Sequence, residues 1–134
     1  MKVVFDTNVL VSAFVSEGVC SKLLGRARRG QFQLITSSFI LKEFEAVLLK
    51  KLSATKSETK QALRILTEAV SDIVKPSQTL SGICRDPDDD NILSGIIAAS
   101  ADYLVTGDSD LLQMRDFRGT RIITPRDFEI LFED

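Results

Sequence analysis

The chain has 134 residues, of which 44% are hydrophobic and 27% are charged, a formal net charge of −2 and no histidine. This length fits one domain over residues 1–134, and because no apolar run reaches the roughly 20 residues of a membrane span or begins a signal peptide, we expect a cytoplasmic protein. The lack of histidine excludes Ser-His-Asp triads, histidine acid–base chemistry and histidine metal sites.

The hydrophobic pattern alternates between short β-branched runs and longer segments with helical spacing. In chain order it predicts a strand over 2–5, helices over 9–15 and 21–29, a strand over 32–36, helices over 39–52 and 57–73, a loop over 76–88 with room for a short strand at its start, a helix over 91–101, a strand over 103–106, a helix over 108–113, a strand over 120–124 and a helix over 125–132. Strands that alternate with helices predict an α/β fold, a three-layer α/β/α sandwich with a mainly parallel central sheet of four to five strands.

Two acidic residues follow predicted strands. Asp6 comes directly after the strand over 2–5, and Asp108 lies just beyond the strand over 103–106. Ligands of parallel sheets bind at the carboxyl ends of the strands, so the two carboxylates meet if these strands are neighbours. Taken singly, each residue is also an ordinary helix cap.

Glu43 lies on the apolar face of its predicted helix, between Phe39 and Val47, whereas Glu45 points to the opposite side. A carboxylate on a buried face needs a partner. That partner is either a metal ion or a basic side chain at the edge of the fold.

Residues 86–90 place four carboxylates within five residues at the start of a predicted helix. The helix dipole favours one or two of them, and a divalent cation would relieve the repulsion among the rest, although a solvated loop also explains the run. Carboxylates without His or Cys select Mg²⁺ or Mn²⁺, and such sites serve phosphoryl chemistry.

Basic residues concentrate in the first part of the chain. Residues 1–75 hold 12 Lys and Arg against 7 Asp and Glu, whereas residues 76–134 hold 5 against 12. This asymmetry suits a protein that holds cations against a polyanion, although two solvated faces explain it equally well. The two cysteines, Cys20 and Cys84, lack the paired spacing of a zinc site, so we expect two buried or idle thiols in a reduced compartment.

The sequence resembles the PIN-domain nucleases (PilT N-terminus-like), and among them small prokaryotic proteins of toxin–antitoxin pairs. The segments that carry the resemblance are VVFDTNVL at 3–10, SSFILKEF at 37–44, DPDDDNIL at 86–93, ADYLVTGDSDLL at 101–112 and IITPRDF at 122–128. The resemblance implies Mg²⁺- or Mn²⁺-dependent cleavage of single-stranded RNA, a cognate antitoxin protein and often a homodimer. A catalytically silent module that binds RNA or protein is the alternative.

Positions matched to this family give the candidate site. The catalytic candidates are Asp6, Glu43, Asp89, Asp90 and Asp108. All of these except Glu43 are also candidate metal ligands, and Asp89 ranks ahead of Asp90 as the third acidic position. Supporting roles fall to Asn8, Thr106 and Asp110. Candidates for RNA phosphate contacts are Lys22, Arg26, Arg28, Arg29, Lys42, Lys50 and Lys51.

Overall fold

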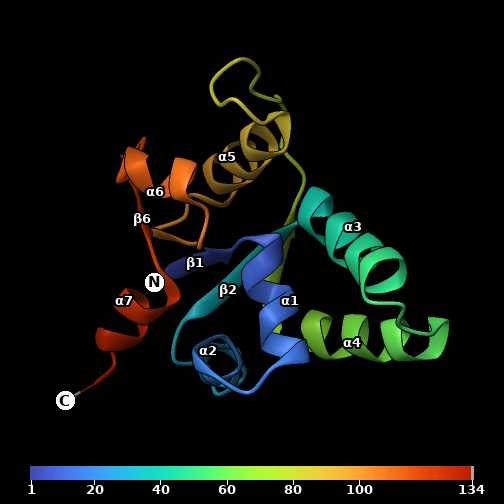
Figure 1. The fold of residues 1–134 in the computed structure, drawn as a ribbon. Coiled ribbons are helices and arrows are strands. Elements are labelled where there is room, and N and C mark those ends of the chain that lie inside the picture. Colours follow the sequence, from blue (N-terminus) through green and yellow to red (C-terminus); the bar gives the residue numbers. More distant parts are fainter. Residues whose placement is uncertain (134) are drawn as a thin grey trace.

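In the computed structural model, which describes residues 1–133, a six-stranded sheet runs through the middle of the molecule in the order β3-β2-β1-β4-β6-β5 (Figure 1). The strands are β1 (Lys2–Phe5), β2 (Gln33–Ser37), β3 (Val70–Val74), β4 (Tyr103–Val105), β5 (Asp116–Phe117) and β6 (Thr120–Ile123). The helices are α1 (Thr7–Val15), α2 (Val19–Arg28), α3 (Ser38–Ala46) with a π-helical continuation η1 (Val47–Lys51), α4 (Lys56–Ala69), α5 (Pro87–Ala99), α6 (Ser109–Met114) and α7 (Pro125–Ile130).

Five strands of the sheet run parallel, and β5 forms an antiparallel edge with β6. The α5 helix packs on one side of the sheet, whereas α1, α2 and α7 lie on the other (Figure 1). The structure thus confirms the α/β sandwich on a mainly parallel sheet. It adds strands to the expected four to five, because β3 and β5 complete the two edges.

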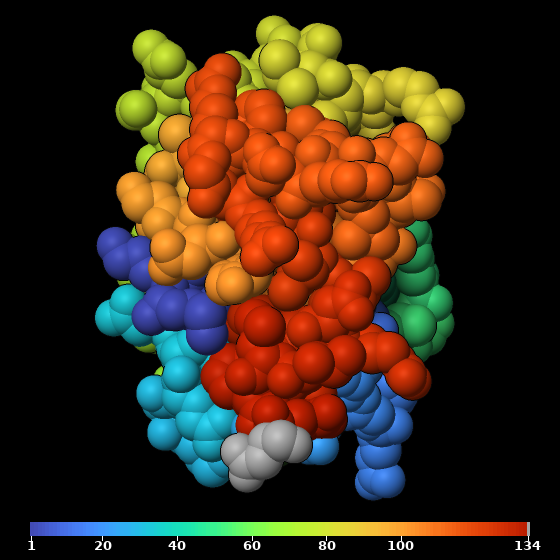
Figure 2. All heavy atoms as spheres, turned by 90° about the vertical axis from the view of Figure 1, so that its left-hand side faces the viewer, coloured from blue at the N-terminus to red at the C-terminus, as the bar shows by residue number. Residues whose placement is uncertain are grey.

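The strand β1 is the centre of the core, since Val3, Val4 and Phe5 are almost fully buried. On the side of α7, the ring of Phe128 packs against Phe5 and Phe32 at centroid distances of 6.4 and 5.1 Å, both edge to face. These contacts fix the C-terminal helix on the sheet. Figure 2 views the molecule from the left-hand side of Figure 1, and the orange and red C-terminal part of the chain covers much of the surface seen there.

The expected helix over 57–73 is wrong in its last turn, because residues 70–74 form strand β3. Val70, Ile73 and Val74 are β-branched and fit a strand better than a helix. Pairing with β2 decides the outcome, with Ile73 opposite Thr36. Ile73, expected to face inward on a helix, is 45% exposed on this edge strand.

Several helices begin earlier than the sequence suggested, and two of these shifts concern the acidic residues. The α1 helix starts at Thr7, and α5 starts at Pro87 with Asp86 as its N-cap, so Asp88, Asp89 and Asp90 lie in the first turn of α5. A proline at the first helical position favours this start. Among residues 1–133, no helix combines the length and apolar character that a membrane crossing requires.

The packing of α5 on the sheet is close at Gly95. A Cβ atom built there would lie 3.3 Å from the Cβ of Ser37 at the end of β2. We expect Gly95→Val to lower the free energy of unfolding by about 1–3 kcal/mol through overpacking. Ala98→Val, on the exposed side of the same helix, should cost about 0.5 kcal/mol through helix propensity alone. Urea unfolding measures both free energies, and an equal decrease in the two variants would contradict the close packing at Gly95.

Candidate active site

The carboxyl ends of β1 and β4 lie side by side and bring two acidic residues together. Asp6 caps α1 by accepting a hydrogen bond from the Val9 backbone N–H at 2.9 Å. Its second oxygen accepts a short hydrogen bond from the Thr106 hydroxyl, which in turn accepts one from the Asp108 backbone N–H at 3.0 Å. Asp6 is therefore both a helix cap and part of an acidic cluster, so the two explanations from the sequence hold together.

Glu43 reaches the cluster from α3, on the opposite wall. Its Oε1 accepts a hydrogen bond from the Thr7 hydroxyl at 2.5 Å, and Thr7 is the buried first residue of α1. Among residues 1–133, the side chain that donates to Glu43 is thus a hydroxyl group next to Asp6, and no basic side chain forms an ion pair with it. Glu45 is exposed, as the helical pattern predicted.

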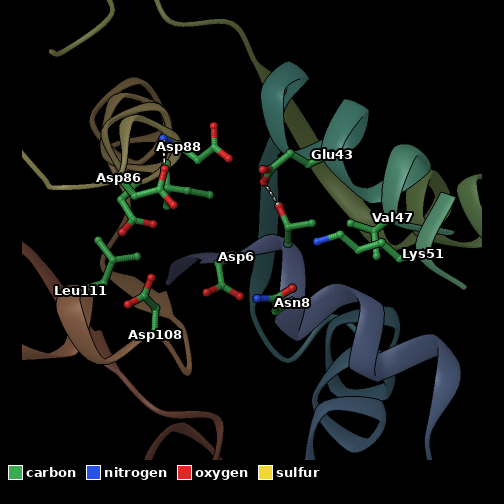
Figure 3. Close-up of a pocket in the computed structure, with 12 residues that line it drawn as sticks. Asp6, Asn8, Glu43, Val47, Lys51, Asp86, Asp88, Asp108 and Leu111 are labelled. Carbon is green, nitrogen blue, oxygen red and sulfur yellow. Dashed lines mark hydrogen bonds between the residues drawn. The ribbon is translucent and has the colours of Figure 1, made fainter. Parts of the chain in front are cut away.

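The acidic run at the start of α5 divides in two. Asp86 caps the helix, and Asp86, Asp88 and Asp89 line the pocket that also holds Asp6 (Figure 3). Asp90 points elsewhere, because its carboxylate accepts a hydrogen bond from the Cys84 backbone N–H at 2.7 Å. The structure therefore brings Asp89, and not Asp90, to the candidate site.

The pocket has a volume of about 240 Å³, and acidic side chains dominate it. Its carboxylates come from Asp6, Glu43, Asp86, Asp88, Asp89 and Asp108, and its cation is Lys51 from η1. Figure 3 shows these carboxylates on facing walls around Asp6. One carboxylate oxygen each from Asp89, Asp108 and Asp110 lie within 4.8 Å of one another, a spacing that suits a divalent cation.

Burial and, after it, the neighbouring carboxylates raise the pKa of three of these acids. Burial, followed by the charge of Asp108, raises the pKa of Asp89 to about 7. Burial also raises the pKa of Asp6, with a further contribution from Asp108. The pKa of Glu43 is raised by burial and then by Asp88, against the lowering effect of its hydrogen bond from Thr7. A cation bound among these groups would relieve their repulsion, so the donor set fits a hard metal ion.

The supporting candidates lie at the same site. Asn8 lines the pocket, and Thr106 is fully buried between Asp6 and Asp108. Asp110 lies in the first turn of α6, where one of its oxygens accepts a hydrogen bond from Arg85 at 2.6 Å.

The basic candidates are spread over several elements. Lys51 lines the pocket, whereas Lys42 and Lys50 are exposed nearby in sequence on α3 and η1. Lys22 and Arg26 pair with the buried Glu129 of α7, at 3.2 and 2.6 Å. The remaining two, Arg28 and Arg29, lie at the C-terminal end of α2.

Sequence reasoning missed Thr7, and it included Asp86 and Asp88 in the acidic run without naming either as a site residue. The start of α5 could have been found from the Asp86-Pro87 pair, because Asp is a favoured N-cap and Pro a favoured first helical residue. Thr7 offered no such signal, since its role depends on Glu43, 36 residues away in the chain.

Comparison with known proteins assigns the chain to a family. A family described as PIN domain matches residues 2–110, which is most of the chain. An uncharacterized protein of Methanocaldococcus jannaschii is 35% identical over 120 residues, a stretch that covers 87% of this chain and 76% of that protein. The chain belongs to the PIN domain family.

A solved structure supports the same fold. VapBC2 from Rickettsia felis, bound to a DNA fragment from its promoter, superimposes with a TM-score of 0.67 and 19% identity. The match covers 91% of this chain and 97% of that chain. At this level of identity the likeness establishes the shared fold.

Because the pKa of Asp89 is raised, we expect the stability of the metal-free chain to depend on pH. The folded chain binds this proton more tightly than the unfolded chain, so its contribution to stability is fully present below about pH 4 and is lost as the pH rises to about 7. In EDTA, the melting temperature should therefore fall by a few degrees over this range. Asp89→Asn should reduce that fall and raise the melting temperature at pH 8.

Asp116→Asn is the matched control, because Asp116 is exposed on β5 and outside the pocket. It should keep the pH dependence of the wild type. A pH profile of Asp89→Asn that matches the wild type would contradict the assignment of the raised pKa.

Proposed function

We propose that this chain is a Mg²⁺- or Mn²⁺-dependent endoribonuclease that hydrolyses phosphodiester bonds of single-stranded RNA. The observation that carries the proposal is the convergence of Asp6, Glu43, Asp89 and Asp108 in one pocket at the carboxyl ends of the central strands. Membership of the PIN domain family supports nuclease chemistry. RNA as the substrate, the metal dependence and the roles of single residues are parts of the proposal.

In this proposal Asp6, Asp89 and Asp108 hold the metal, and Asp110 lies close enough to assist. Asp90 is not included, because its carboxylate is turned toward the Cys84 amide. A divalent ion bound by these residues would supply an activated water and would neutralise the charge that develops on the phosphate.

The side chains around these ligands position them and handle protons. The Thr106 hydroxyl fixes the orientation of Asp6, as partners of metal ligands commonly do. Glu43, on the opposite wall and with a raised pKa, accepts the proton of the attacking water. Lys51 contributes a positive charge toward the RNA phosphates. In-line attack would leave a 5′-phosphate and a 3′-hydroxyl.

The direct test is cleavage of labelled single-stranded RNA by the purified chain in Mg²⁺, Mn²⁺ or EDTA. We expect activity with either metal, none in EDTA, and a loss of about 100-fold or more in Asp6→Asn, because the variant loses a metal ligand. Asp116→Asn, which removes the same charge outside the pocket, should cleave like the wild type.

Cleavage that survives in EDTA or in Asp6→Asn would overturn the mechanism. If the wild type binds RNA but cleaves it under no condition, the chain is a silent binding module.

We also propose that the chain is the toxin of a type II toxin–antitoxin pair in the cytoplasm, acting as a homodimer. Support for an antitoxin partner comes from the shared fold with a chain of the Rickettsia felis VapBC2 complex. Induced expression in a bacterial host should arrest growth, because cleavage of cellular RNA stops protein synthesis. Asp6→Asn, produced at the same level, should not. Equal growth of the two cultures would contradict a toxin role.

A further inference from the structure

The candidate active site carries more negative charge than its one lysine can balance. Six carboxylates line the pocket together with Lys51, while the proposed substrate is a polyanion. Metal ions neutralise the centre of such a site, but the phosphates on either side of the scissile bond need cations at the rim. Lys51 lies on the wall formed by α3 and η1 (Figure 3).

Arg85 is a cation next to the opposite wall, although it does not itself line the pocket. Its Nη2 donates a hydrogen bond to Asp110 of α6 at 2.6 Å. The residues that follow these two in the chain, Asp86 and Leu111, both line the pocket on that wall (Figure 3). Asp110 also contributes an oxygen to the cluster with Asp89 and Asp108. The Asp110 carboxylate thus connects Arg85 to the proposed metal ligands Asp89 and Asp108.

The segment before α5 is built to hold Arg85 in this place. The backbone N–H of Cys84 donates to Asp90 at 2.7 Å, and the backbone N–H of Leu80 donates to the Ser94 hydroxyl at 2.9 Å. Both acceptors are buried side chains of α5. This gives Asp90 a role outside the metal site, because it anchors the residue that precedes Arg85.

The guanidinium of Arg85 is only partly used. Its side chain is 85% exposed, and within residues 1–133 the contact to Asp110 is its one side-chain hydrogen bond. Arg26 differs, since it is 15% exposed and donates from Nε, Nη1 and Nη2 to Glu129 and Gln31. Arg26 is therefore a structural ion-pair residue, whereas Arg85 keeps donors directed to solvent beside the site.

We propose that Arg85, held in position by Asp110, binds a phosphate of the RNA strand next to the one that is cleaved. Arginine suits this task because its planar donors match phosphate oxygens and its charge is permanent. The strand would then cross the pocket between Arg85 and Lys51. This inference rests on the proposed ribonuclease function and adds a phosphate-binding position to it.

The test measures binding of labelled single-stranded RNA in the Asp6→Asn background with Mg²⁺, so that cleavage does not interfere. Adding Arg85→Ala should weaken binding several-fold and reduce the slope of log K against log salt concentration by about 0.7, the value for one lost phosphate contact on a single strand. Arg85→Lys should restore the slope but only part of the affinity. Lys60→Ala, an exposed cation on α4 outside the pocket, is the matched control.

Neutral methylphosphonate linkages then locate the contact. In the Asp6→Asn background, one linkage beside the scissile bond should weaken binding when it is neutral, and this penalty should vanish in Arg85→Ala. If the Arg85–Asp110 pair is purely structural, the penalty measured at each linkage should be the same with and without Arg85→Ala.

If Arg85→Ala binds RNA as tightly as Lys60→Ala does, while the wild-type chain cleaves RNA, the Arg85 proposal is overturned and the ribonuclease function stands. A wild type that neither binds nor cleaves RNA would overturn both.

Discussion

The candidate site depends on the parallel pairing of β1 with β4. The register places Phe5 opposite Val105, so the next residues of the two strands, Asp6 and Thr106, emerge side by side. The Thr106 hydroxyl then joins Asp6 to the backbone of Asp108. Because both strands are buried in the core, this arrangement cannot shift without disturbing the sheet, which gives the acidic cluster a rigid base.

Around this base, the fold holds together groups that repel one another. Burial, followed by the charge of Asp108, raises the pKa of Asp89 to about 7. Close packing of α5 on β2 at Gly95 holds Asp89 in place, and hydrogen bonds from Thr7 and Thr106 hold Glu43 and Asp6. Functional sites commonly concentrate such unfavourable contacts, which a bound cation relieves.

Much of the architecture could be predicted from local patterns. Alternating strands and helices give the sandwich, and the helical position of Glu43 correctly separates it from Glu45. The last turn of the predicted fourth helix could not be recognised as a strand, because residues 70–74 become β3 only by pairing with β2. The sequence ranked Asp89 only narrowly ahead of Asp90 for a similar reason: a rotation of about 100° between consecutive helical residues sends Asp89 to the pocket and Asp90 to the loop, and this depends on how α5 packs.

The sequence by itself determined a carboxylate site without histidine, on an α/β fold with acids at the strand ends, because residue type and local periodicity carry that information. Only the tertiary structure decided which acids meet, that Thr7 donates to Glu43, and that Arg85 bonds to Asp110 beside the acidic cluster while Arg26 pairs with Glu129. These contacts join residues that are 25 to 103 positions apart in the chain. They depend on strand order and helix rotation, which no local pattern encodes.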